Sequence, residues 1–183
     1  MNNLVTLKSL LIIGAVLVVI GCTENTTVEK DINNPILAEK PVNEVVKQGD
    51  NLNLDVYKSP TCGCCKTWMS HIQQSDIAVQ GHDTDGLSQL KFDKGIRPQY
   101  QSCHTAISPE GYVFEGHVPA KFIHQFLAQE HSKDVIGLSV PAMPVGSPGM
   151  EMGDKFMPYQ VLLLKSDGSA LVYASLNSYE EQF

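Results

Sequence analysis

The sequence predicts an α/β domain between about residue 52 and residue 183, and three observations lead to this fold class. Short apolar runs, one of them strictly alternating with polar residues, have the period of β-strands. Segments with apolar residues at helical spacing lie between these runs. The whole segment has the size at which one chain encloses one hydrophobic core, so a single domain is expected.

The first half of the domain is predicted to alternate strands and helices. Residues 52–57 alternate apolar and polar side chains and predict a strand, and residues 77–79 predict a second one. The helix predicted between them, over residues 65–74, carries an apolar face made of Trp68, Met69 and Ile72. A short second helix is predicted to follow, with Thr84 or Asp85 as its N-cap, Leu87 and Leu90 on its apolar side, and Gly95 at its end.

The second half is predicted to contain two hairpins separated by a helix and a long loop. Residues 105–107 and 112–114 flank a Pro-Glu-Gly turn and predict the first hairpin. Pro119 suits the first turn of a helix whose apolar stripe includes Phe122 and Phe126. Residues 140–158 are rich in proline, glycine and methionine and predict a loop. The last hairpin is predicted from two apolar segments, residues 161–164 and 170–173, around Lys-Ser-Asp-Gly-Ser.

This β-α-β-α-β-β-α order with an additional C-terminal β-hairpin looks like the thioredoxin fold. Cys62 and Cys65 have the Cys-x-x-Cys spacing of that fold's redox site and stand between a predicted strand and a predicted helix. In that architecture the loop before the third strand faces the cysteine motif. Cys103 and His104 are therefore expected beside it.

The N-terminus resembles a lipoprotein signal. A short apolar run over residues 10–20 follows Lys8 and ends in Val-Ile-Gly-Cys, which is similar to a bacterial lipobox. We therefore expect a signal peptide at residues 1–21, a lipid-anchored Cys22 and a polar, flexible tether at residues 22–51. These features predict a protein on the periplasmic side of a bacterial cell envelope, with Thr23 slightly favouring the outer membrane.

The charge and the cysteine pattern exclude two common classes. The formal net charge of −7 argues against nucleic acid as a partner. Four cysteines remain once Cys22 is set aside, but three of them crowd into residues 62–65. A structural disulfide gains most from closing a long loop, so this crowding argues against a purely structural role.

Cys62, Cys64 and Cys65 lie where a helix N-terminus favours thiolate over thiol. Several thiolates in one pocket repel each other, and two remedies exist: a redox pair, Cys62 and Cys65, forms a disulfide, or a cation binds among the sulfurs. Soft sulfur ligands select Cu(I), and bridging thiolates would allow more than one ion. Zinc on Cys62, Cys65, Cys103 and His104 is the weaker alternative, and no ferredoxin spacing is present.

Histidine and methionine extend the candidate ligand set. His104 is a candidate metal ligand, or a group that hydrogen-bonds to a ligand, and His117 could point to the same pocket. Met143 and Met150 are candidate thioether ligands in the long loop, as are Met152 and Met157, although methionine also fills gaps in cores. Three further histidines are expected to be solvated: His71, His124 and His131.

Four separate motifs resemble the CopG-type copper-resistance family, whose members are exported thioredoxin-like metal-binding proteins formerly described as a domain of unknown function. In order along the chain they are Tyr-Lys-Ser-Pro-Thr-Cys-Gly-Cys-Cys at residues 57–65, Ser-Cys-His-Thr-Ala at 102–106, Glu-Gly-His-Val-Pro-Ala at 115–120 and Pro-Ala-Met-Pro-Val-Gly-Ser-Pro-Gly-Met-Glu at 141–151. The chain departs from the family in its apparent lipobox and in the tail after Glu151.

This resemblance implies a copper-binding protein of the cell envelope that holds copper on Cys62, Cys64, Cys65 and Cys103. It also implies a role in interconverting Cu(I) and Cu(II), with copper-export or copper-delivery proteins as candidate partners. Two alternatives stay open. One is a thiol–disulfide oxidoreductase acting on exported proteins, and the other is a copper storage or delivery module without catalysis.

Overall fold

The computed structural model describes residues 52–183. The predicted signal peptide, Cys22 and the tether lie outside the described residues. The strands are β1 (Asn53–Lys58), β2 (Ala78–Asp83), β3 (His104–Ile107), β4 (Val113–Gly116), β5 (Val135–Val140), β6 (Tyr159–Lys165) and β7 (Ala170–Leu176). The helices are α1 (Gly63–Gln73), α2 (Leu87–Asp93) and α3 (Ala120–Leu127), with short 3₁₀ turns η1 (Pro98–Tyr100) and η2 (Tyr179–Gln182). Within residues 52–183, no helix combines the length and the apolar character that a membrane crossing requires.

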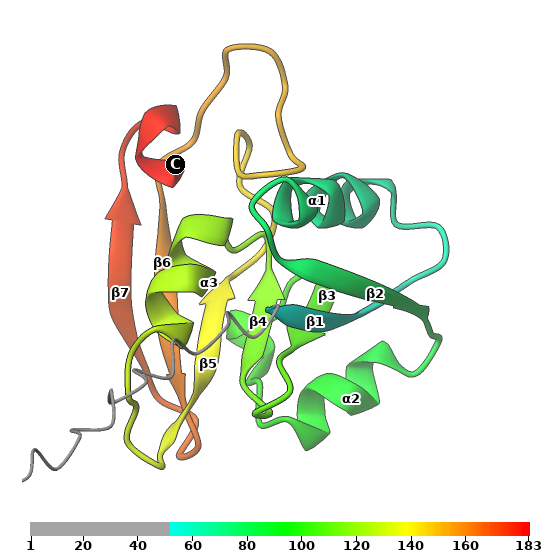
Figure 1. Ribbon diagram of the computed structural model, residues 1–183, viewed down its shortest axis with the longest axis vertical. Coiled ribbons are helices and arrows are strands. Elements are labelled where there is room, and N and C mark those ends of the chain that lie inside the picture. The colour runs from blue at the N-terminus through cyan, green and yellow to red at the C-terminus, as the bar shows by residue number, and fades with distance from the viewer. Residues whose placement is uncertain (1–51) are drawn as a thin grey trace, which may run out of the picture. The chain divides into compact units, whose positions relative to one another are not determined.

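The strands form one mixed sheet in the order β2-β1-β3-β4-β5-β6-β7 (Figure 1). The pairs β1–β2 and β4–β5 are parallel, and the other four neighbouring pairs are antiparallel. The predicted α/β class is confirmed, and each predicted strand and helix overlaps an observed one. The sheet is wider than predicted because it also contains β5.

Strand β5 was missed because its sequence does not alternate. It lies between β4 and β6, and its last four residues, Gly137 to Val140, are all buried. A strand covered on both faces has an apolar run in place of an alternating pattern, and such a run carries no clear period. The predicted loop therefore begins after β5 and not within it.

Helices α1 and α3 cover one face of the sheet, and α2 lies on the other (Figure 1). Trp68 of α1 and Phe126 of α3 share a buried cluster with Phe114 of β4. The residues on either side of Phe114 point to the other face of the sheet, because side chains alternate along a strand. Val113 accordingly belongs to a second buried cluster, with Leu164 of β6.

The long loop between β5 and β6 packs against the start of α1. Gly149 has a φ of +83°, and a Cβ atom at this position would lie 2.7 Å from the backbone nitrogen of Trp68 and 2.8 Å from the Cys64 carbonyl oxygen. Only glycine combines that conformation with so close an approach. The loop therefore packs directly against the helical turn that carries the cysteines.

Candidate metal centre

Three cysteines surround the N-terminus of α1. Cys62 is the N-cap residue, and its sulfur accepts the Cys65 N–H at 3.3 Å. Cys62 and Cys65 are joined by a disulfide, while Cys64 is free with its Sγ 3.6 Å from that of Cys62. A cap satisfied by sulfur keeps both members of the Cys-x-x-Cys pair at the positive end of the helix, where thiolates are stabilised.

Cys103 approaches these thiols from the segment before β3. Its carbonyl oxygen lies 3.9 Å from Cys65 Sγ, and the sulfur atoms of Cys62, Cys64, Cys65 and Cys103 all lie within 4.8 Å of one another. Burial, reinforced by the neighbouring Cys64, raises the pKa of the Cys103 thiol to about 12. Metal-free Cys103 is therefore protonated at neutral pH, and a bound cation would have to displace that proton.

His117 directs a ring nitrogen at the Cys103 sulfur. Its Nε2 lies 3.0 Å from Cys103 Sγ, and its Nδ1 lies 2.7 Å from the Pro148 carbonyl oxygen. A carbonyl only accepts, so Nδ1 carries the proton. Burial lowers the pKa of His117, so its ring is neutral and Nε2 presents a lone pair to the thiol. Metal-binding histidines commonly have this arrangement, in which a backbone carbonyl fixes the tautomer.

His104 completes a second group of donors around Cys103. The ring is fully buried, and its Nδ1 lies 3.3 Å from Cys103 Sγ. Among the described residues its Nε2 has no hydrogen-bond partner. Burial, with His117 and Lys91 nearby, holds the pKa of His104 well below its usual range. The imidazole is therefore neutral and able to donate a lone pair.

The two donor groups share one residue. Four sulfurs form the first group, and Cys103, His104 and His117 form the second, again with donor atoms within 4.8 Å. The soft sulfur group suits Cu(I), and imidazole together with one thiolate suits several transition metals. The disulfide removes two thiolates from the first group, so the full set of sulfur ligands exists only in the reduced protein.

The predicted methionine ligands have different surroundings. Met150 is half-buried and follows Gly149, whereas Met143 is 47% exposed. Met152 and Met157 are exposed as well. Met150 thus follows the residue that packs on α1, and the other three methionines are exposed to solvent.

Three histidines that were expected to be solvated have partners within the protein: His71, His124 and His131. His71 Nε2 accepts the Ala120 N–H at 3.2 Å, and His124 Nε2 donates to the Ser75 carbonyl oxygen at 2.7 Å. His131 stacks on Phe126 with ring centroids 3.8 Å apart. His71 and His124 thus join segments 49 residues apart, and His131 packs on the neighbouring Phe126 and on Tyr112. Helical periodicity does not reveal such contacts.

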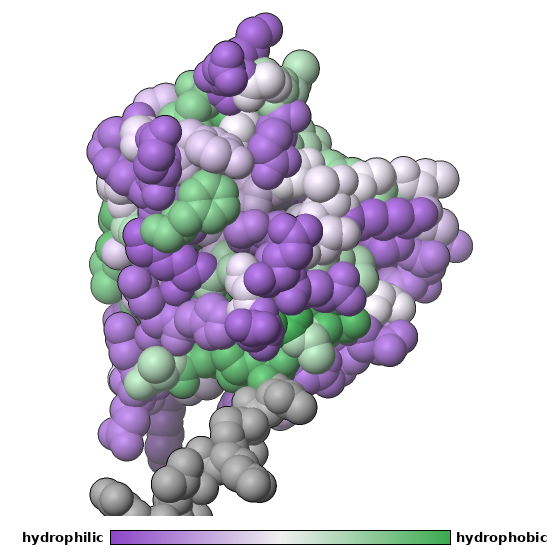
Figure 2. Space-filling model, turned by 45° about the horizontal axis from the view of Figure 1, so that its top comes forward, coloured by the Kyte–Doolittle hydropathy of each residue, from purple (hydrophilic) through white to green (hydrophobic). Residues whose placement is uncertain are grey.

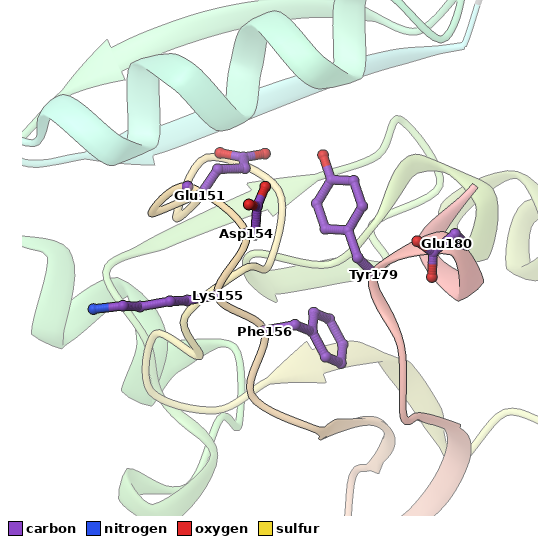
Figure 3. A pocket seen from close by; sticks show the side chains of 7 residues that line it. Glu151, Asp154, Lys155, Phe156, Tyr179 and Glu180 are labelled. Carbon is purple, nitrogen blue, oxygen red and sulfur yellow. The ribbon is translucent and has the colours of Figure 1, made fainter.

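A separate acidic pocket opens between the long loop and the C-terminal 3₁₀ turn (Figure 3). It has a volume of about 340 Å³, and its lining residues are Glu151, Gly153, Asp154, Lys155, Phe156, Tyr179 and Glu180. None of these is a predicted ligand.

In Figure 2 the hydrophobic side chains on the visible face lie in separate patches between polar ones.

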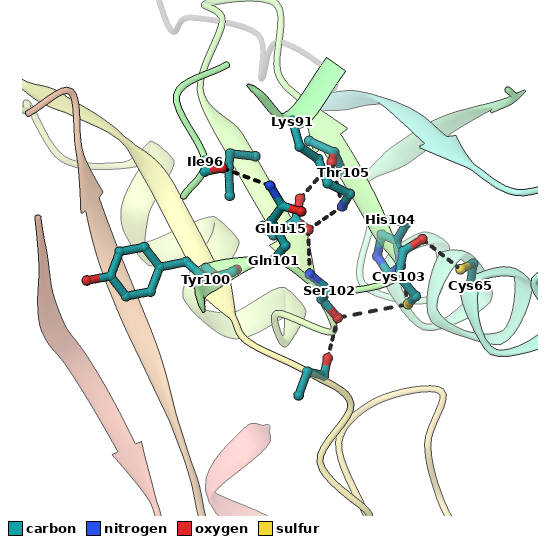
Figure 4. A network of polar contacts seen from close by, with 12 residues as sticks. Cys65, Lys91, Ile96, Tyr100, Gln101, Ser102, Cys103, His104, Thr105 and Glu115 are labelled. Atoms are coloured by element: carbon teal, nitrogen blue, oxygen red, sulfur yellow. Dashed lines mark hydrogen bonds and ion pairs between the residues drawn. The ribbon is translucent and has the colours of Figure 1, made fainter. Parts of the chain in front are cut away.

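A buried ion pair behind Cys103 was not predicted. The Lys91 side chain, 4% exposed, contacts the fully buried Glu115 carboxylate (Figure 4). Charged residues are rarely fully buried, so composition gives no indication of such a pair. The one available signal was the position of Glu115, directly after the apolar residues 112–114 of the predicted strand.

Fold and site together define a cysteine- and histidine-rich α/β domain with a candidate centre for a soft metal ion. Two solved structures resemble it, "Copper resistance protein copG" in Form 1 and Form 2, with 40% and 39% sequence identity and a TM-score of 0.64 each. Each match covers 69% of this chain and 98% or 99% of the other. The chain therefore belongs to the copper resistance protein CopG family, as its motifs predicted.

A family model agrees with this assignment. Residues 100–150 match the model described as a protein of unknown function, DUF411. This range contains Cys103, His104 and His117 but not the cysteines of α1. No curated protein matches the chain.

Proposed function

We propose that the reduced protein binds Cu(I) on Cys62, Cys64, Cys65 and Cys103 as part of copper resistance in the cell envelope. The observation that carries this proposal is the approach of four sulfur atoms to within 4.8 Å of one another. Clustered thiolates repel one another unless a cation lies among them, and sulfur favours Cu(I). Family membership supports copper as the metal.

His104 and His117 act as further ligands, or hold Cys103 in place, in this proposal. The fixed tautomer of His117 favours direct binding because its Nε2 lone pair already faces the shared thiol. Met150 is the best placed of the four loop methionines, because the other three are exposed. A loop thioether would add a soft ligand that resists oxidation.

The same cysteines supply electrons in the redox part of the proposal. When the Cys62 and Cys65 thiols join in a disulfide, two electrons and two protons leave. The electrons reduce two Cu(II) ions to Cu(I). An external dithiol donor then has to reduce the disulfide before another cycle. The thioredoxin-like layout predicted from the sequence fits this chemistry, and so does the disulfide at the start of α1.

The proposal includes the location predicted from the N-terminus. A lipid on Cys22 would attach the domain to a membrane on the periplasmic side through the tether at residues 22–51. Copper-export or copper-delivery proteins would then be the partners. Labelling with a radioactive fatty acid tests the anchor, and Cys22→Ser should abolish the label.

Anaerobic titration of the reduced full-length protein with Cu(I), against a competing chelator, tests the central claim. We expect tight binding that is strongly weakened by Cys62→Ser and by Cys103→Ser. Cys22→Ser is the matched control, because it removes a cysteine outside the domain and should leave the affinity unchanged. Absence of binding, or full affinity in the two site variants, would refute the proposal.

A second candidate function is thiol–disulfide exchange with exported proteins, favoured by the Cys62–Cys65 disulfide at a helix N-terminus. The segment before β3 argues against it. Enzymes of that class resemble one another in having a cis-proline there, and this chain has Ser102, Cys103 and His104, with no cis peptide bond among the described residues. Insulin reduction at thioredoxin-like rates would favour this second function, and its absence would favour copper binding.

A further inference from the structure

The segment that carries Cys103 and His104 is held from behind by a single carboxylate. Glu115 Oε1 accepts the Ser102 N–H at 2.7 Å, and Oε2 accepts the Thr105 hydroxyl at 2.6 Å (Figure 4). Ser102 precedes Cys103 and Thr105 follows His104. One side chain thus binds both ends of the short segment that contains the two candidate ligands.

Lys91 closes this arrangement from α2. Its Nζ contacts Glu115 Oε1 and also donates to Thr105 Oγ1 at 3.1 Å. Every polar atom of the cluster therefore has a partner, although Lys91 and Glu115 are almost completely buried. The lysine neutralises the carboxylate, so the cluster adds no net charge beside the thiols.

The cluster lies on the opposite face of the sheet from the thiols. Glu115 and Thr105 face each other across β3 and β4 in the strand register, and both contact Lys91 of α2. The preceding His104 points to the other face, where its ring contacts Trp68 of α1 with centroids 4.3 Å apart. Glu115 therefore influences the centre through the backbone of residues 102–105.

The side chain of Ser102, at the start of this segment, is also closely packed. Gly116 has a φ of +73°, and a Cβ atom there would lie 2.5 Å from the Ser102 Cβ. Ser102 Oγ in turn donates to the Ala142 carbonyl oxygen at the start of the long loop. Movement of Ser102 would thus disturb both Cys103 and the loop that carries Pro148.

We propose that Glu115, together with Lys91, is a positioning residue that holds Cys103 and His104 in their ligand geometry before a metal binds. This inference rests on the proposed function for its copper readout. A buried ion pair is a weak source of stability, since well-packed apolar residues commonly replace one without loss. Apolar residues could not accept the Ser102 N–H and the Thr105 hydroxyl. Ligands held in place beforehand lower the ordering cost of binding.

Two double variants separate this role from a merely structural one. Lys91→Met/Glu115→Met keeps the volume and leaves no buried charge, but it cannot bind residues 102 and 105. Lys91→Met/Glu115→Gln also removes the charge, but the amide can accept from Ser102 N–H and donate to Thr105 Oγ1. We expect the first to lower the apparent Cu(I) affinity about tenfold, as when only a tenth of the molecules are binding-competent. The second should remain within about twofold of wild type on the same basis.

Leu176→Ala is the control for lost stability, because it opens a cavity in β7 without contacting the segment at residues 102–105. It should leave the affinity unchanged. Wild-type affinity in both double variants, or equal losses in both, would overturn the inference. If the Met/Met variant does not fold, Thr105→Val replaces it in the test. This change removes the hydroxyl that donates to Glu115 and leaves the Ser102 N–H bond to Glu115 in place. Thr105→Val should then weaken binding about threefold by the same population argument, and unchanged affinity would overturn the inference.

A metal-free readout distinguishes failure of this inference from failure of the proposed function. Iodoacetamide modification at Cys103, followed by peptide mass spectrometry, reports how often this half-buried thiol becomes fully accessible. We expect modification in the Met/Met variant to be at least threefold faster than in wild type and in the Met/Gln variant. An unchanged rate would overturn the inference. A faster rate in a protein that does not bind Cu(I) would support the inference and refute the copper proposal.

Discussion

The two sides of the centre differ in how they are built. The α1 side contains Cys62, Cys64 and Cys65, which are neighbours in the sequence and are held by one helix N-terminus. The β3–β4 side contains Cys103, His104 and His117, whose positions depend on the sheet, on α2 and on the long loop. A local motif thus supplies most of the sulfur, and tertiary structure supplies the geometry that brings a further sulfur and two imidazoles to it.

Comparison of Cys103→Ser with Cys64→Ser tests this difference most strongly. Cys103 belongs to both donor groups, whereas Cys64 belongs to the sulfur group alone. We expect Cys103→Ser to lower Cu(I) affinity more than 100-fold. Loss of a residue that only hydrogen-bonds to a metal ligand already lowers metal affinity by about 10–100-fold. Cys64→Ser should have a smaller effect. Chelator competition measures both, and equal losses would show that the donor groups are not coupled through Cys103.

Replacing Gly149 tests whether the loop unites the two sides. In Gly149→Ala, the new Cβ would meet backbone atoms of α1, and the φ of +83° would be strained. We expect a loss of about 1–3 kcal/mol in the free energy of unfolding, measured by urea denaturation. Gly153→Ala is the matched control, because Gly153 also has a positive φ of +61° but no atom within 4 Å of the added Cβ. A similar loss in both variants would mean that backbone strain, and not packing on α1, is responsible.

The pH dependence of stability gives the smallest expected effect. Burial lowers the pKa of His71, opposed by Glu151, and the same direction holds for His104 and His117. A lowered histidine pKa means that the unfolded chain binds more protons once the pH falls below about 6.5. The metal-free protein should therefore keep its full stability above that pH and lose some of it between pH 6.5 and 5.

His71→Gln should make this decline shallower, because one of the neutral histidines is removed. Urea denaturation at pH 7 and pH 5 measures the difference for both proteins. Gln73→Ala is the control, because it changes an exposed position of the same helix and removes no ionisable group, so it should leave the decline unchanged. An identical decline in His71→Gln and wild type would show that the buried His71 does not contribute.

The predictable part of the molecule was the part governed by local pattern. Alternation and helical spacing located the elements, and the crowding of residues 62–65 identified the sulfur centre. Strand β5 was missed because burial on both faces removes the alternation that distinguishes a strand. The Lys91–Glu115 pair was missed because charged residues are rarely buried, and no local pattern marks the exceptions. The His117–Pro148 bond joins residues 31 positions apart, which no local pattern encodes.

The separation between the two sides also sets an order of assembly. Cys65 and Cys103 are 38 residues apart, and the pairing of β1 with β3 brings their segments together. Contacts between distant residues generally form late, because loop closure opposes them until other contacts compensate. We therefore expect a partly folded chain to expose the thiols of residues 62–65 before Cys103 and the histidines reach them. During that interval the nascent centre is open to premature oxidation or to the wrong metal ion.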